Sequence, residues 1–271
     1  MLFIFVLALF IGATVQYSEG SVFIGILLIL IALLILTRIK LEREPEVKRS
    51  IYFPIAGVFI ILADVAYNFY TSGELGTLDT MLIVLGASLV ASYLKDAQFR
   101  KIGVFGVFMS LTFIVLFSIF FSLFNAFNID LVHRFDHYFV MLPSAYAISS
   151  FGFPVEVVGV ETLRIYGVET LTVVIGGPCS GLYSMFLLAS LVFAYFIAEK
   201  ISFSEMRFPL LLAIGIAYFS NLVRVSIIYL VGHYYGEEAM MTAHVHSGWI
   251  IFIAMAGAIM WLIKGMEKKK S

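Results

Sequence analysis

Charged residues and cysteine are both scarce in this sequence. Asp, Glu, Lys and Arg make up 13% of the 271 residues, and hydrophobic residues make up 62%, whereas about a quarter of a soluble domain is charged. The composition indicates an integral membrane protein, and helices are the expected spans because lipid offers no partner to an open backbone. The single cysteine excludes an internal disulfide and a multi-cysteine metal site. We find no glycine-rich phosphate loop and no nucleic-acid patch, so we expect no cofactor and no nucleic-acid partner.

Eight apolar runs approach or reach the length of about 20 residues that a helix needs to cross a bilayer. They cover residues 2–17, 21–38, 51–71, 80–94, 102–125, 180–198, 210–232 and 246–263. The first and the fourth are short, so their ends are the least defined. The sequence therefore predicts an all-α polytopic membrane protein, a bundle of about eight transmembrane helices in a single domain.

The distribution of Lys and Arg predicts how these spans are oriented. Four segments carry five, three, two and four such residues, respectively: 38–50, 95–101, 199–209 and 264–271. With eight spans, all four segments fall on one side, and the positive-inside rule makes that side the cytoplasm. We expect a multi-pass protein of the plasma membrane with both termini in the cytoplasm. Residues 1–20 could instead be a cleaved signal peptide, although they lack a basic start.

One segment on the predicted outer side, residues 126–178, is long. Within it, residues 155–177 read VEVVGVETLRIYGVETLTVVIGG, which alternates apolar and polar side chains and is rich in Val, Thr and Ile. This pattern is typical of strands, and we expect a β-hairpin with a turn at Gly167. The hairpin could wall the site or pair with an extended peptide. The other parts are five N-terminal spans, three C-terminal spans and a basic tail, in residues 1–125, 179–263 and 264–271.

Cys179 lies at the predicted outer start of the sixth span, in the motif PCSGL at 178–182. Pro178 suits the first turn of a helix. The positive end of the helix dipole and the free amides there lower the pKa of a thiol toward the reactive thiolate. A free cysteine is equally often a small buried hydrophobic residue, so the thiol alone leaves both interpretations open.

Arg224 lies within the seventh span and is a functional candidate because an arginine at that depth is costly to insert. The alternative is a structural arginine paired with a carboxylate. Asn221 precedes it by three residues on the same helix face and could orient the guanidinium or a substrate amide. His244 and His246 stand at the predicted outer mouth of the eighth span. Either one alone is more typical of an interfacial histidine.

The thiol, the guanidinium and the imidazole come from three spans and from the same predicted side of the membrane. Acyl transfer needs such a set: a nucleophile, an acid or base for its proton, and a cation for the developing oxyanion. The motifs PCSGL, NLVRV at 221–225 and HVHSG at 244–248, in this order, resemble those of the exosortase/archaeosortase family of membrane transpeptidases. The resemblance covers roughly residues 150–260, and the lack of an attached soluble domain favours the archaeal branch.

The resemblance implies a sortase-like cysteine peptidase with its active site at the outer face of the membrane. Its substrates would be secreted proteins with a C-terminal sorting signal, made of a short motif, a hydrophobic helix and a basic tail. The enzyme would cut near the motif through a thioester on Cys179. It would then pass the new C-terminus to an acceptor, a membrane lipid in archaea.

The family pattern also implies a role for each residue of the motifs. Cys179 would be the nucleophile and Arg224 the residue that stabilises the oxyanion. His244 would act as acid and base because Gly248 follows it by four residues, and His246 is the second candidate for that role. The supporting residues would be Asn221, Ser180 and Gly181.

Two further polar features remain. Asp64 lies in the third span at about the same depth as Arg224, so the two could pair within the bilayer. His133 and His137, in the sequence HRFDH, have the helical spacing of metal ligands. A third strong ligand is lacking, so we expect an interfacial helical turn and no metal.

Other functions fit the same composition. In a transporter, Asp64 and Arg224 would be charges of the pathway and Cys179 would be incidental. A non-enzymatic assembly factor of the membrane is a third function. The sequence has no inverted repeat of broken helices, which disfavours the transporter.

Overall fold

The computed structural model describes residues 23, 26–28, 30–31, 50–71, 76–127, 130–176 and 180–268. The chain groups into two compact units, each described here by itself. The sheet unit comprises residues 1–39, 124–185 and 212–271, and the helical unit comprises residues 40–123 and 186–211.

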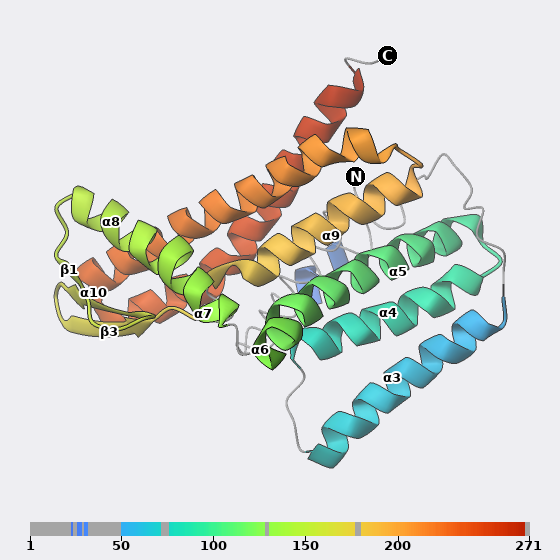
Figure 1. Cartoon of the computed structure of the whole chain (residues 1–271), viewed down its shortest axis with the longest axis horizontal. Helices are drawn as coiled ribbons and strands as arrows, with labels where there is room; N and C mark the ends of the chain where they lie inside the picture. Colours follow the sequence, from blue (N-terminus) through green and yellow to red (C-terminus); the bar gives the residue numbers. More distant parts are fainter. Residues whose placement is uncertain are drawn as a thin grey trace. The chain divides into compact units, whose positions relative to one another are not determined.

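In the helical unit, small residues allow three helices to pack closely side by side (Figure 1). These are α3 (Tyr52–Thr71), α4 (Thr77–Tyr93) and α5 (Ala97–Phe117), the last continued by the π-helical η1 (Ser118–Leu123). A Cβ on Gly57 would lie 2.4 Å from the carbonyl oxygen of Gly86, and one on Gly103 would lie 2.3 Å from the amide nitrogen of Ser92. Such close backbone contacts between small residues are typical of helices that associate in membranes.

Three helical stretches are long and apolar enough to cross a membrane, among the residues that the structure describes. They are Tyr52–Thr71, Ala97–Ser122 and Phe203–Ile259, and two shorter apolar helices are Thr77–Tyr93 and Leu182–Ala198. A membrane protein of apolar helices is thereby confirmed. The count of eight is not confirmed, because the predicted spans 2–17 and 21–38 lie wholly or largely outside the described residues. The last two predicted spans fall on Phe203–Lys268, two helices that follow one another across a kink at Gly236.

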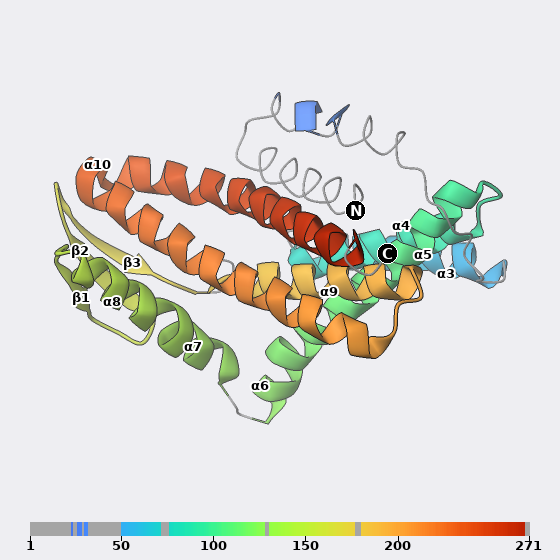
Figure 2. The same ribbon diagram turned by 90° about the horizontal axis from the view of Figure 1, so that it is seen from above.

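The sheet unit contains a helical segment followed by three strands. The helical elements are α6 (Phe124–Ala126), α7 (Leu131–Phe135), the π-helical η2 (Asp136–Met141) and α8 (Leu142–Ser150). The strands are β1 (Val155–Val157), β2 (Thr162–Tyr166) and β3 (Thr170–Val174), and they form an antiparallel sheet in the order β1-β2-β3 (Figure 2). The predicted hairpin with its turn at Gly167 is confirmed, and β1 adds a strand to it.

One face of the sheet forms the core of this unit. Leu163 and Ile165 of β2 are 0% and 1% exposed, because alternate residues of a strand point to the same face. They pack in one cluster with Val140 of η2, Ile148 of α8 and Tyr229 of α10 (Phe203–Lys268). The sheet is thus fixed to the helix that carries the predicted active-site residues.

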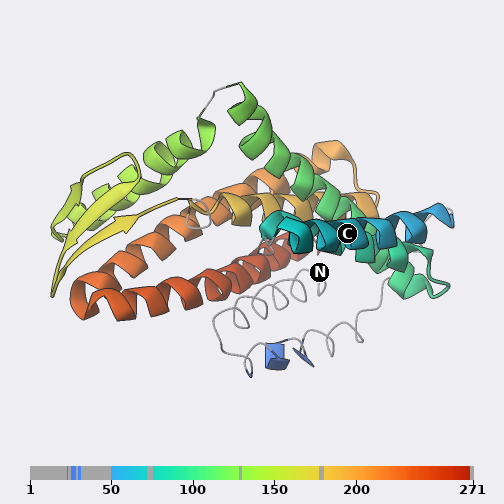
Figure 3. The same ribbon diagram turned by 90° about the horizontal axis from the view of Figure 1, so that it is seen from below.

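Two helices make up α10 and meet at Gly236, whose φ of 83° and ψ of −171° break the helical path. Within the sheet unit the two parts run side by side, as the orange and red ribbons of Figure 3 show. The β2–β3 turn holds this bend: Val168 N–H donates to the His233 carbonyl at 3.0 Å, and Glu237 N–H donates to the Glu169 carboxylate at 2.5 Å. A Cβ on Gly236 would lie 2.3 Å from that carboxylate, so the bend requires glycine.

Candidate active site

Ser180 and Gly181 shape the start of α9 (Leu182–Ala198). Cys179, the predicted nucleophile, lies outside the described residues together with Pro178 and is joined to Ser180 by a peptide bond. Ser180 is 2% exposed, and its hydroxyl accepts a hydrogen bond from Leu182 N–H at 3.3 Å. This is the bond that a serine makes when it caps a helix.

Asn221 joins the first two motifs. Its Nδ2 donates to the Ser180 carbonyl at 2.9 Å, and its side chain is buried. Gly181 has a φ of +79°, and a Cβ there would lie 2.5 Å from Asn221 Cγ. Only glycine permits both this φ without strain and this close approach.

Arg224 joins the second and third motifs. It follows Asn221 by one helical turn, and its Nη2 donates to the His244 carbonyl at 3.4 Å. The guanidinium also lies against Gly248, where a Cβ would be 3.3 Å from Nη2 and 3.4 Å from Cζ. The two parts of α10 therefore meet at the arginine, and the absence of a side chain at Gly248 leaves room for it.

His244 and His246 point to different sides of the second part of α10. Each residue of an α-helix advances by about 100°, so His244 lies on nearly the same face as Gly248, and His246 lies roughly opposite. His246 instead lines an open pocket of 530 Å³ together with Tyr235, Glu238, Ala239, Thr242 and Ala243. His244 thus shares the face that contacts Arg224. It lies well inside the helix rather than at its mouth, because the helix resumes directly after Gly236.

Asp64 belongs to the helical unit, where it is 7% exposed. Its carboxyl group lies near that of Asp79 of α4, and Asn68 Nδ2 donates to the Asp64 carbonyl at 3.0 Å. Asp79 directly precedes the predicted fourth span, 80–94, so the span prediction does not point to this neighbour. The predicted pair of Asp64 and Arg224 would join the two units and stays a prediction.

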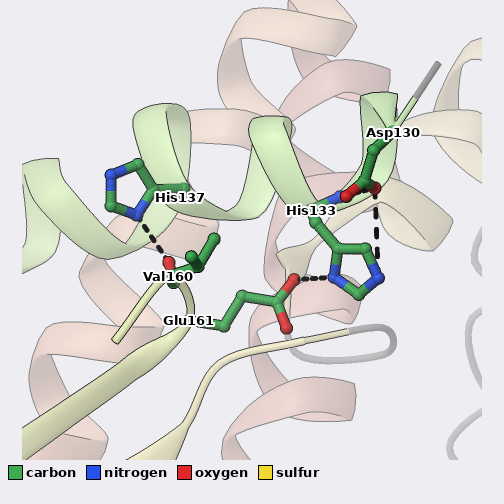
Figure 4. A network of polar contacts seen from close by, with 5 residues as sticks. All are labelled: Asp130, His133, His137, Val160 and Glu161. Carbon is green, nitrogen blue, oxygen red and sulfur yellow. Dashed lines mark hydrogen bonds and ion pairs between the residues drawn. The ribbon is translucent and has the colours of Figure 1, made fainter. Parts of the chain in front are cut away.

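The two histidines of HRFDH hold a corner of the sheet (Figure 4). His133 Nδ1 contacts the Glu161 carboxylate, its Nε2 lies 3.9 Å from Asp130, and His137 Nδ1 bonds the Val160 carbonyl at 2.5 Å. The hydrogen bond to Glu161 raises the pKa of His133 above its ordinary value. Within the described ranges, no group of three His, Cys, Asp or Glu side chains could hold a metal ion. The helical spacing marked these histidines, but Glu161, 28 residues further on, could not be foreseen.

A family model described as transmembrane exosortase matches residues 16–261 of the chain. The chain belongs to the transmembrane exosortase family. The match spans all three motifs, from Pro178 to Gly248. The comparisons with curated proteins and with solved structures found no match. As an exosortase, the protein is a membrane enzyme of the transpeptidase type, in a family that acts on secreted proteins with sorting signals.

Proposed function

We propose that this exosortase cleaves the C-terminal sorting signal of a secreted protein through a Cys179 thioester and transfers the new C-terminus to an acceptor. One series of contacts carries the proposal: Ser180, the residue bonded to Cys179, accepts from Asn221, and Arg224 one turn later bonds the His244 carbonyl. Residues of three motifs far apart in the sequence are therefore linked through Asn221 and Arg224. Ser180 directly follows the proposed nucleophile in the sequence, and this connection supports the proposal.

In the first half-reaction, the Cys179 thiolate attacks the scissile carbonyl carbon. The Arg224 guanidinium stabilises the oxyanion of the tetrahedral intermediate. The intermediate collapses, the carbon–nitrogen bond breaks, and protonated His244 gives its proton to the leaving amine. The products are a thioester on Cys179 and the released sorting helix.

In the second half-reaction, neutral His244 takes a proton from the acceptor nucleophile, which attacks the thioester carbonyl carbon. Arg224 again faces the oxyanion, and the sulfur leaves as a thiolate. His244 is then protonated for the next cycle, so no cofactor is required to balance the reaction. We propose a membrane lipid as the acceptor, as the archaeal branch of the family would use.

The proposed site faces the outer side of the plasma membrane, with both termini of the chain in the cytoplasm. The four basic segments support this orientation because they fall on one side when eight spans are counted. A membrane-impermeant thiol reagent added to intact cells tests it directly, since Cys179 is the only cysteine. Labelling only after the cells are opened would place the thiol on the cytoplasmic side and contradict the proposal.

The nucleophile is tested by substitution. We expect Cys179→Ala to leave a secreted reporter with a C-terminal motif, helix and basic tail in its uncleaved form. Cys179→Ser should retain at most a trace of processing, because a serine needs stronger activation. Ser184 is a small polar residue in the first turn of α9. Ser184→Ala is therefore the matched control and should process the reporter normally. Normal processing by Cys179→Ala at an equal protein level would end the proposal.

The two histidines form a matched pair for testing the acid and base. His244→Gln should lower the rate of processing by about 10²–10⁴-fold, the usual contribution of a positioned acid or base. His246→Gln should stay close to wild type, because its ring lines the pocket on the other side of the helix. The reverse ranking would assign the role to His246.

A further inference from the structure

The outer edge of β3 is the feature of the sheet that the proposed reaction does not yet use. Ile175 N–H donates to the Glu161 carbonyl at 2.7 Å, and Gly167 N–H donates to the Glu169 carbonyl at 3.2 Å. Residues of an antiparallel strand alternate between bonding the partner strand and facing away from it. Leu171 and Val173 therefore bond β2, as Ile175 does. The backbone groups of the intervening residues, Thr170, Thr172 and Val174, face away from β2.

These outward groups form a row open to pairing. In the part of the chain that the structure describes, no hydrogen bond to another element involves the backbone of Thr170, Thr172 or Val174. The side chains of Thr170 and Thr172 are exposed, and that of Val174 is 63% exposed. A further strand could bond this edge without breaking a hydrogen bond that the structure describes for these three backbones.

The two edges of the sheet differ in how well they are protected from pairing with another strand. Short strands, charges and prolines are the features that prevent such pairing at exposed edges. β1 has all three features, since it is 3 residues long, contains Glu156 and follows Pro154. β3 has none of them: its 5 residues, Thr-Leu-Thr-Val-Val, include no charge and no proline. Of the two edges, β3 is the one suited to receive a strand.

β3 also leads directly to the proposed active site. After Val174 come the buried Ile175 and then Gly176, and Ser180 follows four residues later in contact with Asn221. The six residues from Val174 to Ser180 span at most about 21 Å when fully extended. A peptide that runs beside β3 toward Val174 therefore runs toward the residues that Asn221 contacts, with Arg224 one turn beyond.

We infer that the extended segment of the substrate just before the scissile bond adds to β3 as a parallel strand. This inference rests on the proposed function, because it assigns the binding surface of the same reaction. The substrate segment before the scissile bond must run toward the active site, and the hydrophobic helix of the sorting signal follows it. The segment therefore runs in the same direction as β3. Main-chain hydrogen bonds to Thr170, Thr172 and Val174 hold the segment, as in other proteins that bind peptides at a sheet edge.

Proline substitution at the two edges tests the inference from the enzyme side. Thr172→Pro removes an N–H from the open edge of β3. Val157→Pro is the matched control, because Val158 N–H donates to Thr162 and Tyr166 N–H to Pro154, which leaves the Val157 N–H facing away from β2. Both variants should accumulate in membranes like the wild type. Thr172→Pro should raise KM for a sorting-signal peptide about three- to tenfold, the effect of one lost hydrogen bond, with kcat retained, and Val157→Pro should change KM less than about twofold.

Backbone methylation of the substrate tests the same contact without altering the enzyme. The probe is a synthetic peptide that covers the cleavage site of a reporter whose processing depends on Cys179. N-methylation should raise KM by about three- to tenfold per lost hydrogen bond at every second residue before the cleavage site and have little effect at the residues between. A response without this period of two, or unchanged KM in Thr172→Pro, would overturn the strand pairing. A reporter whose processing did not depend on Cys179 would instead refute the proposed function.

Discussion

Replacing Gly181 with alanine should separate the first motif from the second. The residue has a φ of +79°, and its new Cβ would lie 2.5 Å from Asn221 Cγ. The left-handed backbone costs an alanine about 1–2 kcal/mol. Displacing Asn221 leaves the buried Ser180 carbonyl without its donor, which costs about 1–3 kcal/mol more. We therefore expect a total loss of roughly 2–5 kcal/mol in the free energy of unfolding, the sum of these two costs.

Gly152→Ala supplies the control that separates the two costs. Gly152 has a φ of +86°, but nothing lies within 4 Å of its Cβ position, so this variant incurs the backbone cost alone. The assay is unfolding of both variants in detergent micelles, followed by processing of the sorting-signal reporter in cells. Gly181→Ala should be the less stable of the two and should be nearly inactive, whereas Gly152→Ala should process normally. Equal stability of the variants, with processing retained in both, would refute the contact between Gly181 and Asn221 as the feature that builds the site.

Three other contacts give predictions of known sign. The pKa of His133 is raised in the folded protein. Its bond to Glu161 therefore stabilises the fold fully below the ordinary pKa of about 6.5 and progressively less as the pH rises through the folded value. The difference in Tm between wild type and Glu161→Gln should shrink with rising pH, and a constant difference would contradict this. Glu169→Ala should lower the free energy of unfolding by about 1 kcal/mol, the usual cost of a lost helix cap. Glu169→Gln should lower it less, because the amide oxygen can still accept from Glu237 N–H. Equal unfolding curves for the two variants would exclude a capping role. Gly103→Ala would place a Cβ 2.3 Å from the Ser92 amide nitrogen, and we expect lower protein levels in the membrane as α4 and α5 move apart.

The sequence predicted the local hairpin better than it predicted the path of the helices. Gly167 as a turn and the period-two pattern around it located the hairpin, because both signals are local. The spans 210–232 and 246–263 predict a loop between them, whereas the chain turns at the single residue Gly236 and is helical on both sides. The position of this bend depends on Glu169, 68 residues earlier in the sequence.

Contacts between motifs were beyond the sequence for a related reason. The spacing of Asn221 and Arg224 placed both on one helix face, but it could not show that Asn221 bonds the Ser180 carbonyl 41 residues earlier. His244 and His246 were similarly ambiguous until the helix was seen to be continuous around them. Their separation of two residues then placed them on different sides.

The uninterrupted helix after Gly236 fixes the rotation about its axis at which His244 and Gly248 face Arg224. One inserted or deleted residue between Gly236 and His244 would turn everything downstream by about 100°, carrying Gly248 out from under the guanidinium while the bend itself stayed intact. Changes of about a whole turn would restore the angle but shift the imidazole along the axis by roughly 5 Å. Chain length in this short stretch should consequently be far less tolerant of variation than residue identity.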